Sequence, residues 1–448
     1  MISWWIGSAL STILIHTIGG IGMPEANVRH RPAVAMALSL LFAGLGQLYN
    51  RRYVKGILFI IIEASFLLTF YNFLNIGLWG LVTLGEIPML DHSIFLLIQG
   101  LVSVIIIAFA AALHIANIID ARNDARRRQR GEPFPSLIES CRHAWDRGFP
   151  YIFVTPGLVM LLFIVVLPLL FMVSLAFTDY NLYHSPPRHL LNWVGLENFK
   201  NLVSIPIWKS TFFSVLAWTI VWTVVATTAQ IALGLFLALL VNDPRIKFKR
   251  FIRTVLILPW AVPAFVTILV FAAMFNDKFG AINREVLSLF GVSIPWMTDP
   301  FWTKVALILI QTWLGFPFVF ALFTGVLQSI SRDWYEAADI DGATRWQKFK
   351  SITLPHVLYA TAPLLIMQYA GNFNNFNIIY LFNDGGPAVR GQNAGGTDIL
   401  ISWVYDLTFT TNNYNMAAAI SLIIGLIVSG FAIYQFRRTR SFKEEGNI

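Results

Sequence analysis

Cysteine, charged side chains and the common catalytic motifs are scarce or missing in this sequence. The single Cys141 excludes an intramolecular disulfide and a metal site built from several cysteines. The sequence contains no GxxxxGK[ST] phosphate-binding loop, no HExxH zinc motif and no GxSxG nucleophile motif. We therefore predict that the chain is not an enzyme, hydrolyses no ATP itself, and binds neither a metal nor a cofactor.

Charged residues make up only 12% of the 448 residues, whereas hydrophobic residues make up 56%. Soluble domains are about one quarter charged, so this composition indicates a membrane protein. A formal net charge of +8 could indicate nucleic-acid binding. The basic residues, however, lie between apolar stretches rather than along one face, and we predict no nucleic-acid partner.

Apolar stretches recur along the chain, and each is near the length of about 20 residues that a helix needs to cross a bilayer. The gaps between them hold the charged and turn-forming residues. We predict an all-α integral membrane protein with about eight transmembrane helices. The predicted spans are 56–74, 93–119, 151–177, 211–241, 254–275, 304–328, 357–381 and 416–436.

Lysine and arginine alternate between rich and poor gaps, which predicts the orientation of the chain. The gap 120–150 holds seven arginines, 242–253 holds five basic residues and 329–356 holds four, whereas 382–415 holds only Arg390. Cytoplasmic loops carry the excess of positive charge. The three rich gaps and the basic C-terminus are therefore predicted to be cytoplasmic.

The N-terminal segment 1–55 is harder to interpret. Basic residues flank 33–49 on both sides, which predicts a re-entrant or interfacial helix broken near Gly44 and Gly46. The uncharged stretch 3–22 is a ninth span, a signal peptide, or a segment ahead of the true start.

One acidic residue, Glu63, lies well inside a predicted span. It could pair with Lys55 or with a lipid headgroup near the end of its helix, so we assign it no transport role.

The predicted cytoplasmic loop 329–356 contains two helical stretches. The first carries Glu336, Ala337 and Ala338 and is predicted to end at Gly342, because glycine tolerates a left-handed turn. The second stretch follows directly and is short. A short rigid helix against the ends of membrane spans is suited to docking into a groove of another protein.

In the second stretch, 343–350, Trp346 and Phe349 form an apolar knob at positions i and i+3. Leu354 and Pro355 close the loop. With this spacing, the loop resembles the EAA loop of binding-protein-dependent ABC importer permeases. The resemblance implies that the loop is the coupling helix that docks on an ATPase subunit, through Glu336, Ala337, Ala338, Gly342, Trp346, Phe349, Leu354 and Pro355.

Motifs outside the loop extend the resemblance. LILPWAVPAF (257–266), TWLGFPF (312–318) and NFNNF (372–376) resemble the larger permease subunit of maltose and maltodextrin importers, over roughly 150–440. This implies an ABC importer permease core of the six-helix type at 151–440. Two accessory transmembrane helices and the Arg-rich loop would occupy 56–150.

The resemblance is to the short form of that subunit, because the gap 178–210 leaves no room for the large extracytoplasmic insert of some members. The short form indicates the plasma membrane of a bacterium without an outer membrane. The family also implies the partners: a second, smaller permease subunit forming a heterodimer, an ATPase subunit dimer that uses the ATP, a lipid-anchored extracellular sugar-binding protein, and membrane lipids.

Polar side chains within the spans predict the substrate path, because they are costly at membrane depth unless they face a cavity or one another. Asn372 and Asn375 lie i and i+3 in the predicted seventh span and so are predicted to share one helical face, and Gln311, Gly315 and Phe318 form one stripe of the sixth. Carried over from the maltose subunits, the predicted sugar contacts are Gln311, Leu314, Gly315, Phe318, Asn372 and Asn375.

Three departures from the maltose subunits put the sugar itself in doubt. Gly371 stands where an aromatic contact is expected, Gln311 replaces an asparagine, and Phe318 replaces a tyrosine. The alternative role for these side chains is helix packing, because amides bridge spans and glycine permits close approach. Pro259 and Pro263 are predicted to bend the fifth span.

The predicted function is a permease subunit of an ATP-driven importer for oligosaccharides, with maltose and maltodextrins first. Galacto-oligosaccharides or another plant-derived oligosaccharide are the alternative. An ion-coupled secondary transporter is a remoter alternative, because such proteins usually carry ionisable residues in mid-span and only Glu63 comes near.

Overall fold

The computed structural model describes residues 31–134 and 137–438, so the predicted stretch 3–22 lies outside the described residues. Every regular element within these ranges is helical, which confirms the all-α class. The chain forms two compact units, Met1–Val82 with Leu96–Leu167, and Thr83–Phe95 with Pro168–Ile448. The division predicted at residue 150 stays a prediction.

The helices up to residue 166 contribute mainly to the first unit. They are α2 (Pro32–Leu41), α3 (Leu45–Tyr49), α4 (Tyr53–Thr83), α5 (Ser93–Gln129), α6 (Leu137–Leu161) and a π-helical turn, Leu162–Val166.

The helices after residue 166 belong to the second unit. The α-helices are α7 (Leu167–Leu175), α8 (Glu197–Ser204), α9 (Pro206–Asn242), α10 (Lys249–Ile257), α11 (Ala264–Met274), α12 (Pro300–Ser329), α13 (Arg332–Ile340), α14 (Arg345–Lys348), α15 (Leu354–Phe373), α16 (Phe376–Asn383), α17 (Leu400–Phe409) and α18 (Tyr414–Arg438). Shorter 3-10 and π turns are Leu258–Ala261, Ile282–Val286, Leu287–Phe290 and Phe349–Thr353.

Six described helices are long and apolar enough to cross a membrane, and one bent pair raises the number to seven. The six are Tyr53–Thr83, Ser93–Gln129, Gly148–Leu175, Pro206–Asn242, Pro300–Ser329 and Tyr414–Tyr434. They coincide with six of the eight predicted spans, which differ from the structure mainly in their ends.

The other two predicted spans are not continuous helices. At 254–275 the pair Lys249–Ala261 and Ala264–Met274 bends by 88°, which confirms the bend predicted from Pro259 and Pro263. The prediction of one helix over 357–381 is wrong: α15 ends at Phe373 and α16 begins at Phe376.

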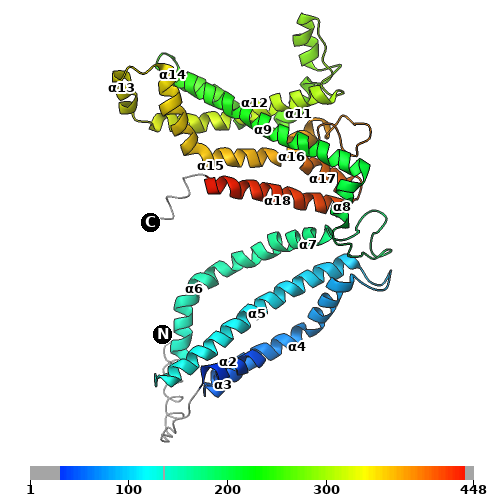
Figure 1. The fold of residues 1–448 in the computed structure, drawn as a ribbon, viewed down its shortest axis with the longest axis vertical. Helices are drawn as coiled ribbons and strands as arrows, with labels where there is room; N and C mark the ends of the chain where they lie inside the picture. Colours follow the sequence, from blue (N-terminus) through cyan, green and yellow to red (C-terminus); the bar gives the residue numbers. More distant parts are fainter. Residues whose placement is uncertain (1–30, 135–136, 439–448) are drawn as a thin grey trace, which may run out of the picture. The chain divides into compact units, whose positions relative to one another are not determined.

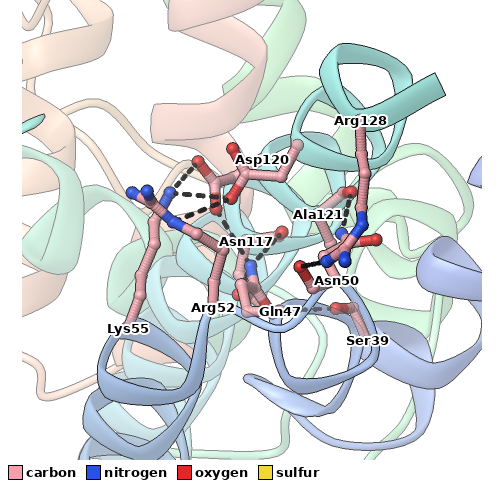
Figure 2. A network of polar contacts seen from close by, with 10 residues as sticks. Ser39, Gln47, Asn50, Arg52, Lys55, Asn117, Asp120, Ala121 and Arg128 are labelled. Carbon is pink, nitrogen blue, oxygen red and sulfur yellow. Dashed lines mark hydrogen bonds and ion pairs between the residues drawn. The ribbon is translucent and has the colours of Figure 1, made fainter. Parts of the chain in front are cut away.

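In the first unit, α2 and α3 form the helical segment predicted at 33–49. The break lies at Gly44, whose φ of 94° is in the left-handed region. Figure 2 shows the polar network at this segment, where Gln47 of α3 reaches Asn117 and Asp120 of α5. Its Nε2 donates to Asn117 Oδ1 at 2.7 Å and to Asp120 Oδ2 at 3.0 Å.

The charged residues of the first unit form ion pairs that differ from those expected. Lys55 Nζ lies 2.6 Å from Asp120 Oδ1 (Figure 2), so the pairing of Lys55 with Glu63 is wrong. Glu63 instead accepts from the backbone N–H of Ala43 and lies 3.4 Å from His114 Nδ1. Glu63 therefore satisfies a backbone donor left open between α2 and α3.

In the second unit, α9 and α12 pack along their lengths, and α15 packs against α9. Figure 1 shows α13 and α14 at one end of α12 and α15, and α8 and α17 near the opposite end of α9. α12 begins where Asp299 accepts from the backbone N–H of Phe301 at 2.9 Å, with Pro300 in its first turn. The predicted polar side chains lie on these long helices, between the two ends of the unit.

Candidate functional site

Three carboxamide side chains meet where α12 approaches the break between α15 and α16. Gln311 Nε2 donates to Asn372 Oδ1 at 2.9 Å, and Asn375 Nδ2 donates to Gln311 Oε1 at 3.0 Å. Gln311 and Asn372 are buried, whereas Asn375 is partly exposed. The structure therefore brings together the three predicted amides, which we call the amide cluster.

The positions of Asn372 and Asn375 in the amide cluster differ from those that the sequence predicts. Asn372 is in the last turn of α15, whereas Asn375 lies beyond it, at the N-cap of α16. The two residues do not share a face of one helix, and that prediction is wrong. The turn at Asn374 brings Asn375 Nδ2 within 3.4 Å of Asn372 Oδ1.

Helix α9 supplies two polar partners that the sequence analysis missed. Thr227 Oγ1 accepts from Asn372 Nδ2 at 2.8 Å, and Gln230 Oε1 lies 3.4 Å from Gln311 Nε2. Gln230 is fully buried and also donates to Gln368 at 3.3 Å. Polar residues inside a predicted span are a signal that could have identified both partners.

Gly315 makes space for Gln230. A Cβ atom at Gly315 would lie 1.8 Å from Gln230 Oε1, closer than any van der Waals contact. This predicted sugar contact therefore has a demonstrable packing role: it lets α12 approach α9 and seat the buried amide.

The remaining predicted contacts surround the cluster unevenly. Leu314 packs against the apolar core around α9, α11 and α12. Phe318, one turn further along α12, makes an edge-on contact with Trp260, with ring centroids 5.9 Å apart. No atom lies within 4 Å of a Cβ built at Gly371, so the position where an aromatic residue was expected borders open space.

The amide cluster is uncharged, since its members are carboxamides and its partner Thr227 contributes a hydroxyl. Each carboxamide offers two donor hydrogens and one acceptor oxygen, which matches a ligand rich in hydroxyl groups. In this structure the amides bond to one another. A ligand would take over some of these hydrogen bonds, beginning with those of the partly exposed Asn375.

The loop 329–356 has the two helical stretches that the sequence predicts. α13 ends before Gly342, whose φ is 75°, and α14 starts after Thr344. Thr344 and Gln347 form a reciprocal capping box, which fixes the start of the short helix. Glu336, Ala337 and Ala338 lie on α13 as predicted.

The stretch from α14 to α15 continues through a π-helical turn, and Trp346 and Phe349 contact each other with ring centroids 5.4 Å apart. Leu354 and Pro355 form the first turn of α15. Lys348 Nζ lies 2.6 Å from Asp339 Oδ1, so an ion pair joins α14 to α13. The predicted apolar knob of Trp346 and Phe349 therefore lies on a loop that this ion pair stabilises.

A groove lies between α13 and the start of α15. It is lined by Trp334, Ala337, Ala338, Asp341, Ser351, Ile352, Pro355, His356 and Tyr359. Trp346 is 67% exposed, and Ile340, which the sequence analysis missed, is 88% exposed. Exposed apolar side chains around a groove are typical of a surface that binds another protein.

The loop between α16 and α17 contains a buried carboxyl group. Burial raises the pKa of Asp398 to about 6, although hydrogen bonds from the hydroxyl of Ser402 and the backbone N–H of Gly395 oppose that rise. This carboxyl group holds the loop together beyond the end of α16. It lies outside the amide cluster.

Comparison with known proteins identifies the family to which the chain belongs. Residues 230–441 match the family described as binding-protein-dependent transport system inner membrane component. The chain is 53% identical over 420 residues to the galactooligosaccharides transport system permease protein GanP of Bacillus subtilis (strain 168), covering 93% of this chain and 100% of that protein. It is 47% identical over 414 residues to the maltodextrin transport system permease protein MdxF of the same organism, covering 90% and 95%.

The maltodextrin transport system permease protein MalC of Streptococcus pneumoniae (strain ATCC BAA-255 / R6) is 46% identical over 427 residues, covering 93% of this chain and 98% of that protein. A solved structure, described as a bacterial ABC transporter involved in the import of the acidic polysaccharide alginate, matches with a TM-score of 0.56 at 21% identity. It covers 68% of this chain and 99% of that chain, and it supports the fold. The relatives are transport components rather than enzymes, and this multi-pass membrane chain belongs to the permease family of binding-protein-dependent ABC importers.

Proposed function

We propose that this chain is the membrane-spanning subunit through which a neutral oligosaccharide enters the cell. The observation that carries the proposal is the uncharged amide cluster of Gln311, Asn372 and Asn375, in a chain whose full-length relatives are oligosaccharide permeases. Carboxamides pair with sugar hydroxyls in both directions. An ion-coupled mechanism has no support from the cluster, because none of its side chains is ionisable.

We rank galacto-oligosaccharides ahead of maltodextrins as the substrate. The identity to the galactooligosaccharide permease is 53%, against 47% and 46% to the two maltodextrin permeases. The sequence analysis ranks them in the opposite order, from motifs that resemble the maltose and maltodextrin subunit.

In the proposed path, Asn375 offers the first hydrogen bonds, because it is the partly exposed member of the amide cluster. Gln311 and Asn372 lie deeper, and Phe318 with Trp260 offers ring faces beyond them. Leu314 and Gly315 set the spacing between helices, through core packing and through the room left for Gln230.

The loop 329–356 is proposed to receive force from a separate ATPase subunit, with its groove and the exposed Ile340 and Trp346 as the docking surface. ATP is used by that partner dimer, and this chain binds no cofactor. A second, smaller permease would complete the path, and a lipid-anchored binding protein would deliver the sugar. The basic residues support a cytoplasmic loop and C-terminus, and the short gap 178–210 supports a cell without an outer membrane.

The test is uptake by the assembled complex. Cells that lack this permease would receive it on a plasmid, and uptake of labelled galactotriose and maltotriose would be measured. Uptake of galactotriose in competition with excess maltotriose ranks the two substrates. The function is wrong if neither sugar is taken up while the complex is present in the membrane.

Affinity purification of this chain tests the partners. We expect one copy each of two different permeases together with two ATPase subunits. An active complex that contains this permease in two copies, without a second permease, contradicts the proposed heterodimer.

A further inference from the structure

Four aromatic rings form a continuous strip across α16 and α17, on the surface of the second unit. Phe376 lies 4.7 Å from Tyr405 and 5.0 Å from Tyr380, measured between ring centroids. Tyr405 lies 5.1 Å from Tyr380 and 4.8 Å from Phe409. We call these four rings the aromatic strip.

The strip lies on the outward faces of its two helices. In α16 the buried residues are Ile378, Ile379 and Phe382, whereas Tyr380 is 37% exposed. In α17 Phe409 is 69% exposed. On each helix the two ring positions are four residues apart, so each helix buries one apolar face and presents a second, aromatic face. On that face Tyr380 and Phe409 are exposed, whereas Phe376 and Tyr405 are partly buried.

The exposed face carries one amide group as well as rings. Asn377, directly beside Phe376, is exposed. An exposed amide in hydrocarbon costs free energy unless it is hydrogen-bonded, so this face suits water or a polar ligand better than lipid chains. Rings with phenol hydroxyls beside a carboxamide match a sugar, which has C–H groups on its faces and hydroxyls at its rim.

The aromatic strip and the amide cluster contain neighbouring residues of the chain. Asn375, whose Nδ2 donates to Gln311, is the N-cap of α16, and Phe376 is the first residue of that helix. The ring contacts continue from Phe376 to Tyr405 and Phe409 of α17, a helix near the end of the unit opposite α13 and α14 (Figure 1).

We propose that the aromatic strip is a second sugar subsite, which holds the units of an oligosaccharide that extend beyond the unit at the amide cluster. This inference rests on the proposed oligosaccharide transport. Stacking on the strip would add binding for long chains and nothing for a disaccharide held by the amides alone. The strip thus determines preference for chain length.

The test compares chain lengths in the complete importer reconstituted in proteoliposomes with its binding protein. Uptake of maltose and maltohexaose, and of galactobiose and galactotetraose, would be measured for the wild type and for Phe409→Ala. We expect the half-saturation concentration for the long member of the transported series to rise several-fold, with the disaccharide unchanged. Phe409→Trp, which keeps a ring, should behave like the wild type.

Phe301→Ala is the matched control, because Phe301 is 65% exposed in the first turn of α12 and lies outside the strip. The inference is overturned if Phe409→Ala and Tyr405→Ala leave long-chain uptake unchanged or affect both chain lengths equally. Loss of the second permease from the purified variants also overturns it, since the strip would then be a subunit interface. If the wild type transports neither series, the proposed function fails first.

Discussion

Asn372 and Asn375 differ in burial and bonding, so replacing each by alanine separates substrate binding from helix packing. Asn372 donates to Thr227 at 2.8 Å and accepts from Gln311 at 2.9 Å, and its side chain is only 3% exposed. Removing it leaves two buried partners short of a hydrogen bond, at about 1–3 kcal/mol each. Membrane proteins fall at the low end of such ranges, so we expect Asn372→Ala to destabilise the chain by about 2–3 kcal/mol.

Asn375 makes one good hydrogen bond, to Gln311 at 3.0 Å, and it is partly exposed. The loss of one such bond costs about 0.5–1.5 kcal/mol. We expect Asn375→Ala to assemble nearly normally, because a partly exposed site can recruit water. If the same amide binds the sugar, the half-saturation concentration for uptake should rise between about 2-fold and 10-fold.

The assay combines thermal unfolding of the purified complex with uptake per assembled complex in proteoliposomes. Asn374→Ala is the control, because its exposed side chain lies between the two test residues and outside the amide cluster. Asn372→Ala should lower the unfolding temperature, and Asn375→Ala should raise the half-saturation concentration. The reasoning is refuted if Asn375→Ala unfolds as early as Asn372→Ala while its uptake per complex stays normal.

Three further substitutions test the loop, the helix packing and the buried carboxyl group. Gly342→Pro should abolish uptake and ATPase co-purification while the chain stays in the membrane, because proline cannot adopt a φ of 75°; normal uptake would contradict docking at this loop. Gly315→Ala should lower the unfolding temperature, because its Cβ would displace Gln230, and Gln230→Ala in the same chain should restore part of the loss. Asp398 has a pKa raised from 3.8 to about 6, so its neutral form stabilises the fold at low pH, and that contribution is lost as the pH rises through about 6. Asp398→Asn should therefore flatten the dependence of unfolding temperature on pH between about pH 4 and 6, and an unchanged pH profile would contradict the assignment.

The loop 329–356 could be predicted from the sequence because its conformation depends on nearby residues. A left-handed turn favours Gly342, and the side chains of Thr344 and Gln347 bond within three residues of each other. The bend in the fifth span follows in the same way from Pro259 and Pro263. In each case the physical cause lies within a few residues of the effect.

The amide cluster could be predicted only in part. The periodicity of apolar residues is the same for one long helix and for two short ones with a turn between them, so the break between α15 and α16 has no signature in hydropathy. The partners of Gln311 and Asn372 on α9 lie 81 and 145 positions away in sequence. Such pairings depend on which helix faces pack together, which a single sequence does not specify.

The break between α15 and α16 also decides how substrate binding and helix packing can coexist in one cluster. In the middle of a continuous helix, the preceding turn restricts the rotamers that an amide side chain can adopt. Asn375 lies between two helices, so its side chain can exchange Gln311 for a ligand while α15 and α16 stay in place. Asn372 is hydrogen-bonded to both α9 and α12, so in the proposed path it would keep the helices in register during that exchange. In this proposal Asn372 serves helix packing and Asn375 serves sugar recognition. The alanine variant of Asn372 should therefore change the unfolding temperature, and that of Asn375 the half-saturation concentration for uptake.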